Sequence, residues 1–299
     1  MSFMTVVEAA QKWGISPRSV RNYCAQGRVE GAFLSGKTWQ IPADAEKPRR
    51  MHAAEKGGVH PRNALLARIF QEKEAGMKGG IYHRLQVDLA YNSNHIEGSR
   101  LTLDQTRLIF ETATIGVGDA SVRVDDVIET MNHFRAVDYV IENAMVPLSQ
   151  PLIKRLHSIL KSSTTDSAKE WFAVGDYKRL PNEVAGRSTT PPERVADDVS
   201  DLLRWYGATD RSFEDVVEFH VRFERIHPFQ DGNGRIGRLI MLKECLANGI
   251  TPFVIADDMK FYYYRGLAEW DDERGFLLET CRAAQDSFRA VLDYFRIDH

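Results

Sequence analysis

Apolar residues recur at helical spacing along most of the chain. Two such runs stand close together, one over residues 213–226 and the next over 236–246. Apolar positions spaced three and four residues apart are typical of an amphipathic helix with one buried face. Ser212 and Asp215 form a capping pair before the first run, and Gly249 provides a stop after the second. The sequence therefore predicts two helices joined by a short loop.

Other segments repeat this pattern, and the chain is predicted to be mostly α-helical. Thr102 and Gln105 open a further helix with a capping box. His157 lies on another predicted helix and is expected to be a packed or capping residue. Residues 171–190 break the helical rhythm with Gly, Pro and Asn, which favours a short β-hairpin.

Residues 1–46 follow a pattern of their own. Thr5 caps a first helix, a second is predicted over 17–25, and apolar positions on both sides of the turn at 35–36 predict two short strands. This order resembles the small winged helix-turn-helix of the MerR and excisionase type, which implies binding of duplex DNA. The cations expected to contact DNA are Arg18, Arg21, Arg28 and Lys37. A packing or dimerisation module is the alternative.

Residues 47–62 are polar, basic and rich in Gly and Pro, which is typical of a linker. The predicted organisation is a winged helix-turn-helix at 1–46, this linker, and a helical domain at 63–299.

Composition narrows the class of protein. The 299 residues are 43% hydrophobic and 27% charged with a net charge of −3, which fits a globular chain without a general attraction to nucleic acid or membranes. Three cysteines do not make a disulfide framework, so a reducing compartment is expected. We expect a cytoplasmic protein, because the N-terminus lacks the pattern of a signal peptide and no apolar stretch approaches a membrane span.

The loop between the two neighbouring helices begins a twelve-residue segment, His-Pro-Phe-Gln-Asp-Gly-Asn-Gly-Arg-Ile-Gly-Arg, at 227–238. Gly232 and Gly234 would allow positive φ and a close approach of an anion to the N–H groups that open the second helix. Arg235 and Arg238 lie three apart and would supply most of the positive charge. This combination predicts a polyphosphate site.

Two more side chains of the segment complete the predicted chemistry. Asp231 is useful beside phosphate if it binds a hard cation such as Mg²⁺. His227 is placed to take a proton from an attacking hydroxyl. Each of these features alone is more typical of a helix cap, a turn or a solvated helix face. A plain turn between two helices, however, does not need the histidine, the carboxylate and the two arginines together.

The segment resembles the signature of the Fic family, His-Pro-Phe-x-(Asp/Glu)-Gly-Asn-Gly-Arg-x-x-Arg, at every fixed position. The resemblance implies a Fic-type helical core with a β-hairpin flap and transfer of AMP from ATP to a hydroxyl group of a protein. It implies that His227 is the general base and Asp231 the Mg²⁺ ligand. The nucleotide-binding residues would be Phe229, Gly232, Asn233, Gly234, Arg235, Arg238 and, from an aromatic segment similar to one that packs on adenine, Tyr263 and Tyr264.

Two further segments resemble parts of the same family. Ser93, Glu97 and Gly98 match the inhibitory motif (Ser/Thr)-x-x-x-Glu-(Gly/Asn) near the end of a helix expected around 81–98, and the resemblance implies a pair between Glu97 and Arg238. The hairpin at 171–190 resembles the flap that aligns a target segment by strand addition. Its residues would be Lys178 and Val184.

The resemblance implies a protein partner with a Ser, Thr or Tyr hydroxyl, and the chain itself is one candidate. Duplex DNA and a homo-oligomer remain open. One alternative is a hydrolase that removes AMP at the same site, with Glu97 positioning water. Another is a DNA-binding regulator whose Fic domain only senses ATP, although sensing needs no base such as His227.

Overall fold

The computed structural model describes residues 3–25, 29, 31–35, 38–47, 63–116, 121–184 and 186–299. The chain divides into two compact units, residues 1–56 and 57–299. The predictions for Arg28, Lys37 and residues 48–62 lie outside the described residues, as does the side chain of Arg18.

The first unit combines two helices with a small antiparallel sheet. Its elements are β1 (Phe3–Met4), α1 (Val6–Trp13), α2 (Pro17–Ala25), β2 (Phe33–Ser35) and β3 (Thr38–Pro42), and the strand order is β1-β3-β2. Thr5 caps α1 in a capping box with Glu8, as predicted for the cap. Trp13 and Ile41 lie in the core between helices and sheet. The strand β1 was not predicted, because two residues are too short to show alternation.

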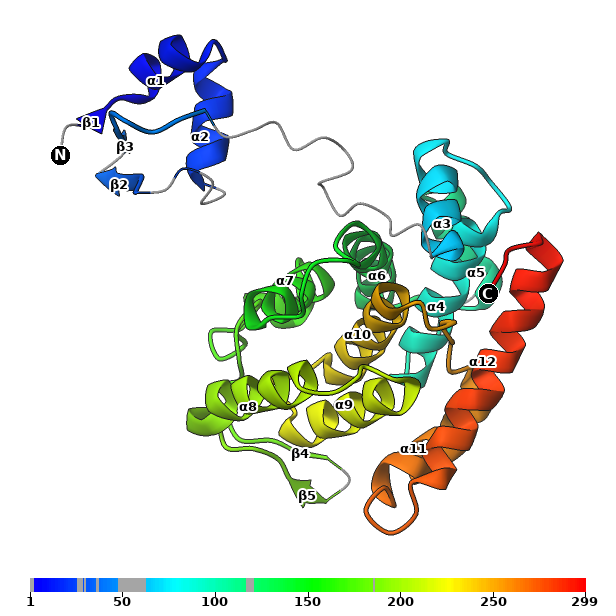
Figure 1. Cartoon of the computed structure of the whole chain (residues 1–299). Helices are drawn as coiled ribbons and strands as arrows, with labels where there is room; N and C mark the ends of the chain where they lie inside the picture. The colour runs from blue at the N-terminus through cyan, green and yellow to red at the C-terminus, as the bar shows by residue number, and fades with distance from the viewer. Residues whose placement is uncertain are drawn as a thin grey trace. The chain divides into compact units, whose positions relative to one another are not determined.

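The second unit is built from helices. They are α3 (Ala64–Glu74), α4 (Ile81–Ile96), α5 (Leu103–Thr112), α6 (Val124–Glu142), α7 (Gln150–Lys161), α8 (Val195–Gly207), α9 (Phe213–Ile226), α10 (Asn233–Asn248), α11 (Lys260–Ala268) and α12 (Gly275–Phe295). Short 3₁₀ turns lie at Thr165–Ala168, Pro192–Arg194 and Asp257–Met259. The antiparallel pair β4 (Glu183–Val184) and β5 (Arg187–Ser188) lies between α7 and α8. Figure 1 shows it below α8 and α9.

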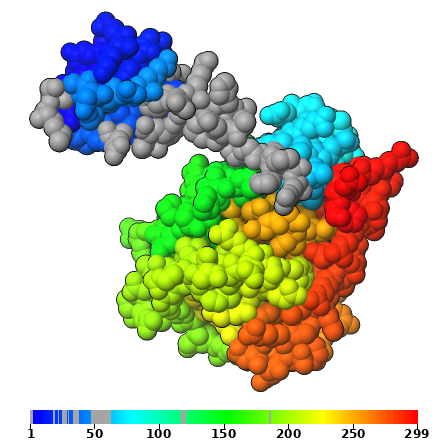
Figure 2. Space-filling view, in the orientation of Figure 1, coloured from blue at the N-terminus to red at the C-terminus, as the bar shows by residue number. Residues whose placement is uncertain are grey.

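Helix α10 lies at the centre of this unit. It packs against α9, α6, α4 and α7 (Figure 1) and is buried on nearly all sides. Figure 2 shows α8 and α9 on the visible face, with the α11 and α12 segments, orange to red, covering the adjacent side. Polar side chains on α10 are therefore fixed by neighbouring helices, which suits a site that needs defined geometry.

The predicted helix ends are confirmed at several places. Ser212 and Asp215 form a capping box before α9, Thr102 and Gln105 form one before α5, and Gly249 ends α10 with φ 68°. Across the described residues, none of the helices has the length and apolar character needed to cross a membrane.

Candidate active site

The loop between α9 and α10 is shaped by Gly232 and Asn233. Gly232 precedes the helix with φ 84°, in the left-handed region that favours glycine. The amide of Asn233 accepts a 2.8 Å hydrogen bond from the N–H of Phe229 and donates a 2.8 Å bond to the Phe229 carbonyl. The Asn233 side chain thus closes the loop on itself. The first N–H groups of α10 have no partner within the helix and are available to bind an anion. We call this start of α10 the cradle.

The prediction of positive φ at Gly234 is wrong. This residue is inside α10 and is absent from the residues with positive φ. A Cβ atom here would collide with Glu97 Oε1 and lie 3.3 Å from Glu97 Cδ and 3.0 Å from Arg238 Nη1. Glycine is needed at this position for space, because the carboxylate of Glu97 lies directly on the backbone of the cradle.

His227 ends α9 with left-handed backbone angles, φ 50° and ψ 61°. Its Nδ1 lies 3.3 Å from the carbonyl oxygen of Glu224. A carbonyl can only accept, so Nδ1 carries the hydrogen and Nε2 keeps its lone pair. Burial, assisted by the charge of Lys178, lowers the pKa of His227 to about 4. The imidazole is therefore neutral at neutral pH and able to accept a proton.

Asp231 belongs to a cluster of ion pairs whose two cations are buried. Its Oδ2 accepts hydrogen bonds from Lys161 Nζ at 2.6 Å and from Arg235 Nη2 at 3.2 Å. Both cations also contact Glu129, each at 2.5 Å. Burial opposes ionisation of Asp231, but the charges of Arg235 and Lys161 lower its pKa to about 2. The carboxylate is therefore ionised at neutral pH.

The donor set around Asp231 fits only one mode of metal binding. No group of three or more His, Cys, Asp or Glu residues suited to a metal occurs among the described residues. Mg²⁺ commonly binds through one or two carboxylates, with phosphate oxygens and water as the remaining ligands. The Asp231 side chain is 45% exposed and can serve in this way. Lys161 already contacts one of its oxygens.

Arg238 is held by the residues of the predicted inhibitory motif. Its Nη2 donates to Glu97 Oε1 at 2.6 Å and to the Ser93 carbonyl at 3.0 Å. Its Nε donates to Ser93 Oγ at 3.0 Å, and its Nη1 donates to Tyr263 Oη at 3.3 Å. Gly98 follows Glu97 with φ 97° and lets the chain leave α4. The structure thus brings Glu97 and Arg238 together and leaves no guanidinium nitrogen of Arg238 without a partner.

The predicted aromatic contacts divide into buried and exposed rings. Phe229 is fully buried and stacks on His157 with ring centroids 4.0 Å apart. Tyr263 is 1% exposed and its hydroxyl is used inside the core. Tyr264 is 43% exposed. Of the two tyrosines expected to pack on adenine, only Tyr264 offers a ring to a ligand. His157 is a packed residue, as predicted, because its Nδ1 accepts from the N–H of Gly175.

Lys178 and Val184, the two residues predicted for the flap, differ in burial. Val184, in β4, is exposed. Lys178 is buried at the foot of the hairpin, where its Nζ contacts Asn182 Oδ1 at 2.7 Å and Thr189 Oγ1 at 2.6 Å. Burial lowers the pKa of Lys178 to about 8. Lys178 therefore fixes the hairpin to the end of α9, where its Nζ lies 3.4 Å from the Ile226 carbonyl.

Four residues of the site were not predicted from the sequence. They are Glu129, Lys161, His220 and Glu224. Nothing in the sequence separates Glu129 and Lys161 from ordinary charges on helix surfaces. His220 and Glu224 precede His227 by seven and three positions, and this spacing on one helical face was an available signal.

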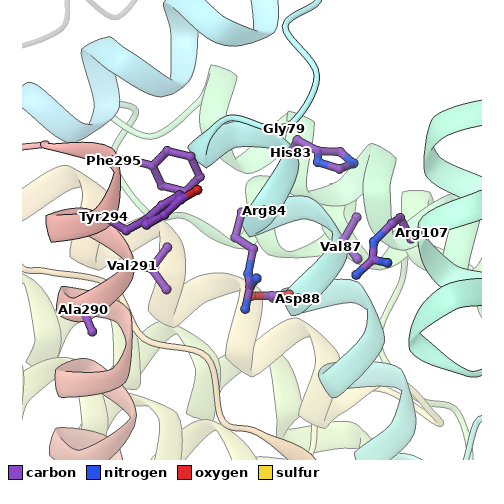
Figure 3. A pocket seen from close by; sticks show the side chains of 10 residues that line it. All are labelled: Gly79, His83, Arg84, Val87, Asp88, Arg107, Ala290, Val291, Tyr294 and Phe295. Carbon is purple, nitrogen blue, oxygen red and sulfur yellow. The ribbon is translucent and has the colours of Figure 1, made fainter.

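A cavity of about 160 Å³ adjoins Asp231, and Glu97, Glu129, Lys161 and Arg235 also line it. Ligand pockets for small molecules commonly measure about 300–1,000 Å³. A larger cavity of about 470 Å³ lies between α4 and α12 and contains Arg84 and Tyr294 (Figure 3). It contains none of the predicted site residues. The smaller cavity, which Glu97 lines, is the one at the candidate site.

Comparison with known proteins shows similarity to the Fic/DOC family. Residues 147–245 match the model of the Fic/DOC family. A Fic domain containing signaling protein from Bacteroides thetaiotaomicron is 26% identical, with a TM-score of 0.57 over 77% of this chain and 90% of that chain. Fic-1 from C. elegans has a TM-score of 0.60 over 79% of this chain and 73% of that chain, at 19% identity. The chain therefore has a mostly helical, Fic-type fold.

Curated relatives share the name protein adenylyltransferase Fic. The one from Nematostella vectensis is 26% identical over 214 residues, which cover 68% of this chain and 48% of the relative. The one from Drosophila erecta is 28% identical over 244 residues, which cover 79% of this chain and 45% of the relative. This chain thus spans about half the length of these relatives.

Proposed function

We propose that this protein is a nucleotidyltransferase that moves AMP from ATP to a hydroxyl group of a protein. The observation that carries the proposal is the joint placement of a neutral His227, an ionised Asp231 and the α10 cradle in one loop. The similarity to proteins named adenylyltransferases supports the same reaction class. A site that only senses ATP would not need the base.

In the proposed reaction the target hydroxyl attacks the α-phosphorus of ATP. Nε2 of His227 takes the hydroxyl proton, the new P–O bond forms, and the bond to the leaving pyrophosphate breaks. General-base help of this kind typically contributes about 10²–10⁴-fold to a rate. The N–H groups at the start of α10 and the side chains of Arg235 and Arg238 stabilise the phosphate charge. Mg²⁺, when bound at Asp231, would neutralise further phosphate charge.

We also propose that Glu97 inhibits this reaction. Its carboxylate lies on Gly234 and holds Arg238, so it fills the space and uses the cation that the outer phosphates need. The small volume of the adjoining cavity supports this reading, since a whole nucleotide requires more room. Inhibition is released when Glu97 leaves Arg238.

Two surfaces are assigned to macromolecular partners. The exposed β4–β5 hairpin would align the target segment by strand addition. The first unit would bind duplex DNA through α2, where Arg21 is exposed. Retention on DNA at low salt that disappears without residues 1–46 is the expected result. Equal retention of both proteins would make this unit a packing module.

Intact-mass spectrometry tests the proposed reaction. The full chain with Glu97→Gly is incubated with ATP and Mg²⁺, and its mass is expected to rise by one or more AMP groups. Adding His227→Ala is expected to abolish the adduct while ATP still binds. If ATP binds to Glu97→Gly and no AMP adduct forms on the chain or on added proteins, the proposed function is wrong. Release of AMP from a modified chain would instead favour the hydrolase.

A further inference from the structure

A series of buried polar side chains lies between Arg238 and His227, outside the loop that joins α9 to α10. Arg238 Nη1 lies 3.3 Å from Tyr263 Oη, and Tyr263 Oη lies 2.6 Å from His220 Nε2. His220 Nδ1 and Glu224 Oε1 both face the space left free at Gly237, where a Cβ would collide with the imidazole and lie 3.0 Å from Oε1. Glu224 Oε2 lies 3.9 Å from His227 Nδ1.

Arg238 determines which groups donate and which accept in this series of side chains. A guanidinium has donors only, so the Tyr263 oxygen accepts from Arg238. The hydroxyl hydrogen of Tyr263 then has His220 Nε2, at 2.6 Å, as its acceptor, and we assign the His220 tautomer on that basis. Burial lowers the pKa of His220 to about 3, so its imidazole is neutral and its hydrogen is on Nδ1. His220 Nδ1 and Glu224 Oε1 both lie beside the free space at Gly237. Glu224 Oε1 is the acceptor group that shares this space, although no hydrogen bond joins it to His220.

The same residue is the acceptor for His227. The Glu224 carbonyl already lies against Nδ1 of His227 at 3.3 Å, and the carboxyl oxygen is the next acceptor at 3.9 Å. Catalytic hydrogen bonds are often longer in free enzymes and shorten when substrate binds. Within the described chain, Glu224 Oε1 and His220 Nδ1 are buried atoms without a hydrogen-bond partner. A buried carboxyl left in this state destabilises the fold, so a packing role explains it poorly.

We propose that Glu224 is the positioning residue of His227: its carboxyl group accepts from Nδ1–H, holds the imidazole in the tautomer with a free Nε2, and stabilises the imidazolium that forms when Nε2 takes the proton. This inference rests on the proposed role of His227 as base. The structural logic is that of an activated nucleophile whose base is oriented by a third group. Once the carboxyl is removed, Nδ1 of His227 keeps only the Glu224 carbonyl as an acceptor.

Several charged groups surround Glu224. Besides burial, the charge of Glu97, at the C-terminal end of α4, raises the pKa of Glu224, and that of Arg238, on α10, lowers it. His220 and His227 flank it on α9, and Tyr263 approaches from α11. Lys178, at the foot of the hairpin, acts on His227. Burial is the largest influence and raises the pKa of the carboxyl to about 8. The positioning role is therefore expected to strengthen as Glu224 ionises.

The test uses ¹⁵N NMR of histidine side chains in the full chain, with His227 assigned from the His227→Ala spectrum. In wild type, Nδ1 of His227 is expected to be protonated and Nε2 free. Glu224→Leu removes both carboxyl oxygens and leaves only the 3.3 Å carbonyl contact, so a larger fraction of His227 is expected in the Nε2–H tautomer. Glu224→Gln has nearly the same shape but only one acceptor oxygen. It is therefore expected to accept a hydrogen bond from only one of His220 and His227. Glu218→Gln, on the same helix but paired with Arg222 and Arg274, is the matched control.

Activity is measured separately in the Glu97→Gly background. Glu224→Leu is expected to lower kcat by about 10–100-fold, a part of the general-base contribution, with KM for ATP changed less than about twofold. Unchanged His227 tautomers in folded Glu224→Leu and Glu224→Gln would overturn the inference. The NMR result does not need catalysis, so a failure of this inference can be told from a failure of the proposed reaction. If only the proposed reaction is wrong, the tautomers of His227 still respond to substitution of Glu224, but the protein makes no AMP adduct.

Discussion

Replacing Glu97 with Gly removes one carboxylate and leaves the cradle, His227 and Asp231 in place. The carboxylate lies 2.6 Å from Nη2 of Arg238, and the Arg238 side chain is 3% exposed and that of Glu97 28%. A hydrogen bond to a charged group contributes about 1.5–3 kcal/mol. A phosphate that reaches Arg238 must displace this bond. Because about 1.4 kcal/mol corresponds to a factor of ten, the substitution is expected to raise productive ATP binding by about one to two orders of magnitude.

The assay compares AMP incorporation and ATP binding for wild type, Glu97→Gly and Glu97→Asp. The aspartate variant is expected to be intermediate, since its shorter side chain still approaches the arginine. Glu269 gives a matched control, because it is also a glutamate at a helix C-cap, in an exposed pair with Arg265. Glu269→Gly is expected to change stability slightly and activity not at all. If Glu97→Gly binds ATP and is no more active than wild type, the inhibitory reasoning is refuted.

Three further predictions address single side chains. His227→Ala is expected to lower AMP transfer by about 10²–10⁴-fold, with ATP affinity nearly unchanged by calorimetry; an undiminished rate would exclude His227 as the base. Lys161→Met removes one of the two cations on Asp231 Oδ2 and is expected to tighten Mn²⁺ binding, measured by electron paramagnetic resonance, by about tenfold or more, whereas Lys154→Met, half-buried on the same helix, should not. Equal affinities would show that Lys161 does not compete with metal. The pKa of Glu224 in the folded protein, about 8, lies above its ordinary 4.5, so the wild type is expected to lose stability as the pH rises between these values, by up to about 1.4 kcal/mol per pH unit. Glu224→Gln does not titrate, so its Tm relative to wild type should rise from pH 5 to pH 8. A Tm difference that stays constant would contradict a protonated Glu224.

The helices and their ends could be predicted because their signals are local. Apolar spacing placed α9 and α10, and the capping pair of Ser212 with Asp215 fixed the start of α9. The strand β1 was missed, because its pairing with β3 joins residues about forty positions apart. A two-residue strand carries no period that a sequence can show.

The candidate site residues that lie in one sequence segment could be predicted, whereas contacts that depend on the packing of different helices could not. The role of Gly234 was misassigned, because the reason for glycine is the carboxylate of Glu97 on another helix. The contact of Lys161 with Asp231 also joins two elements. Burial of Tyr263 follows from its position between α9 and α10, which its aromatic neighbours in sequence do not reveal.

The central claim is transfer of the α-phosphoryl group of ATP, with its adenosine, to a protein hydroxyl. The most direct test incubates Glu97→Gly with ATP carrying a radioactive label at either the α- or the γ-phosphate and then measures label that stays on denatured protein. The account predicts retention of the α-label alone, and its loss when His227→Ala is added. Retention of the γ-label, or of neither label by a protein that binds ATP, would contradict it.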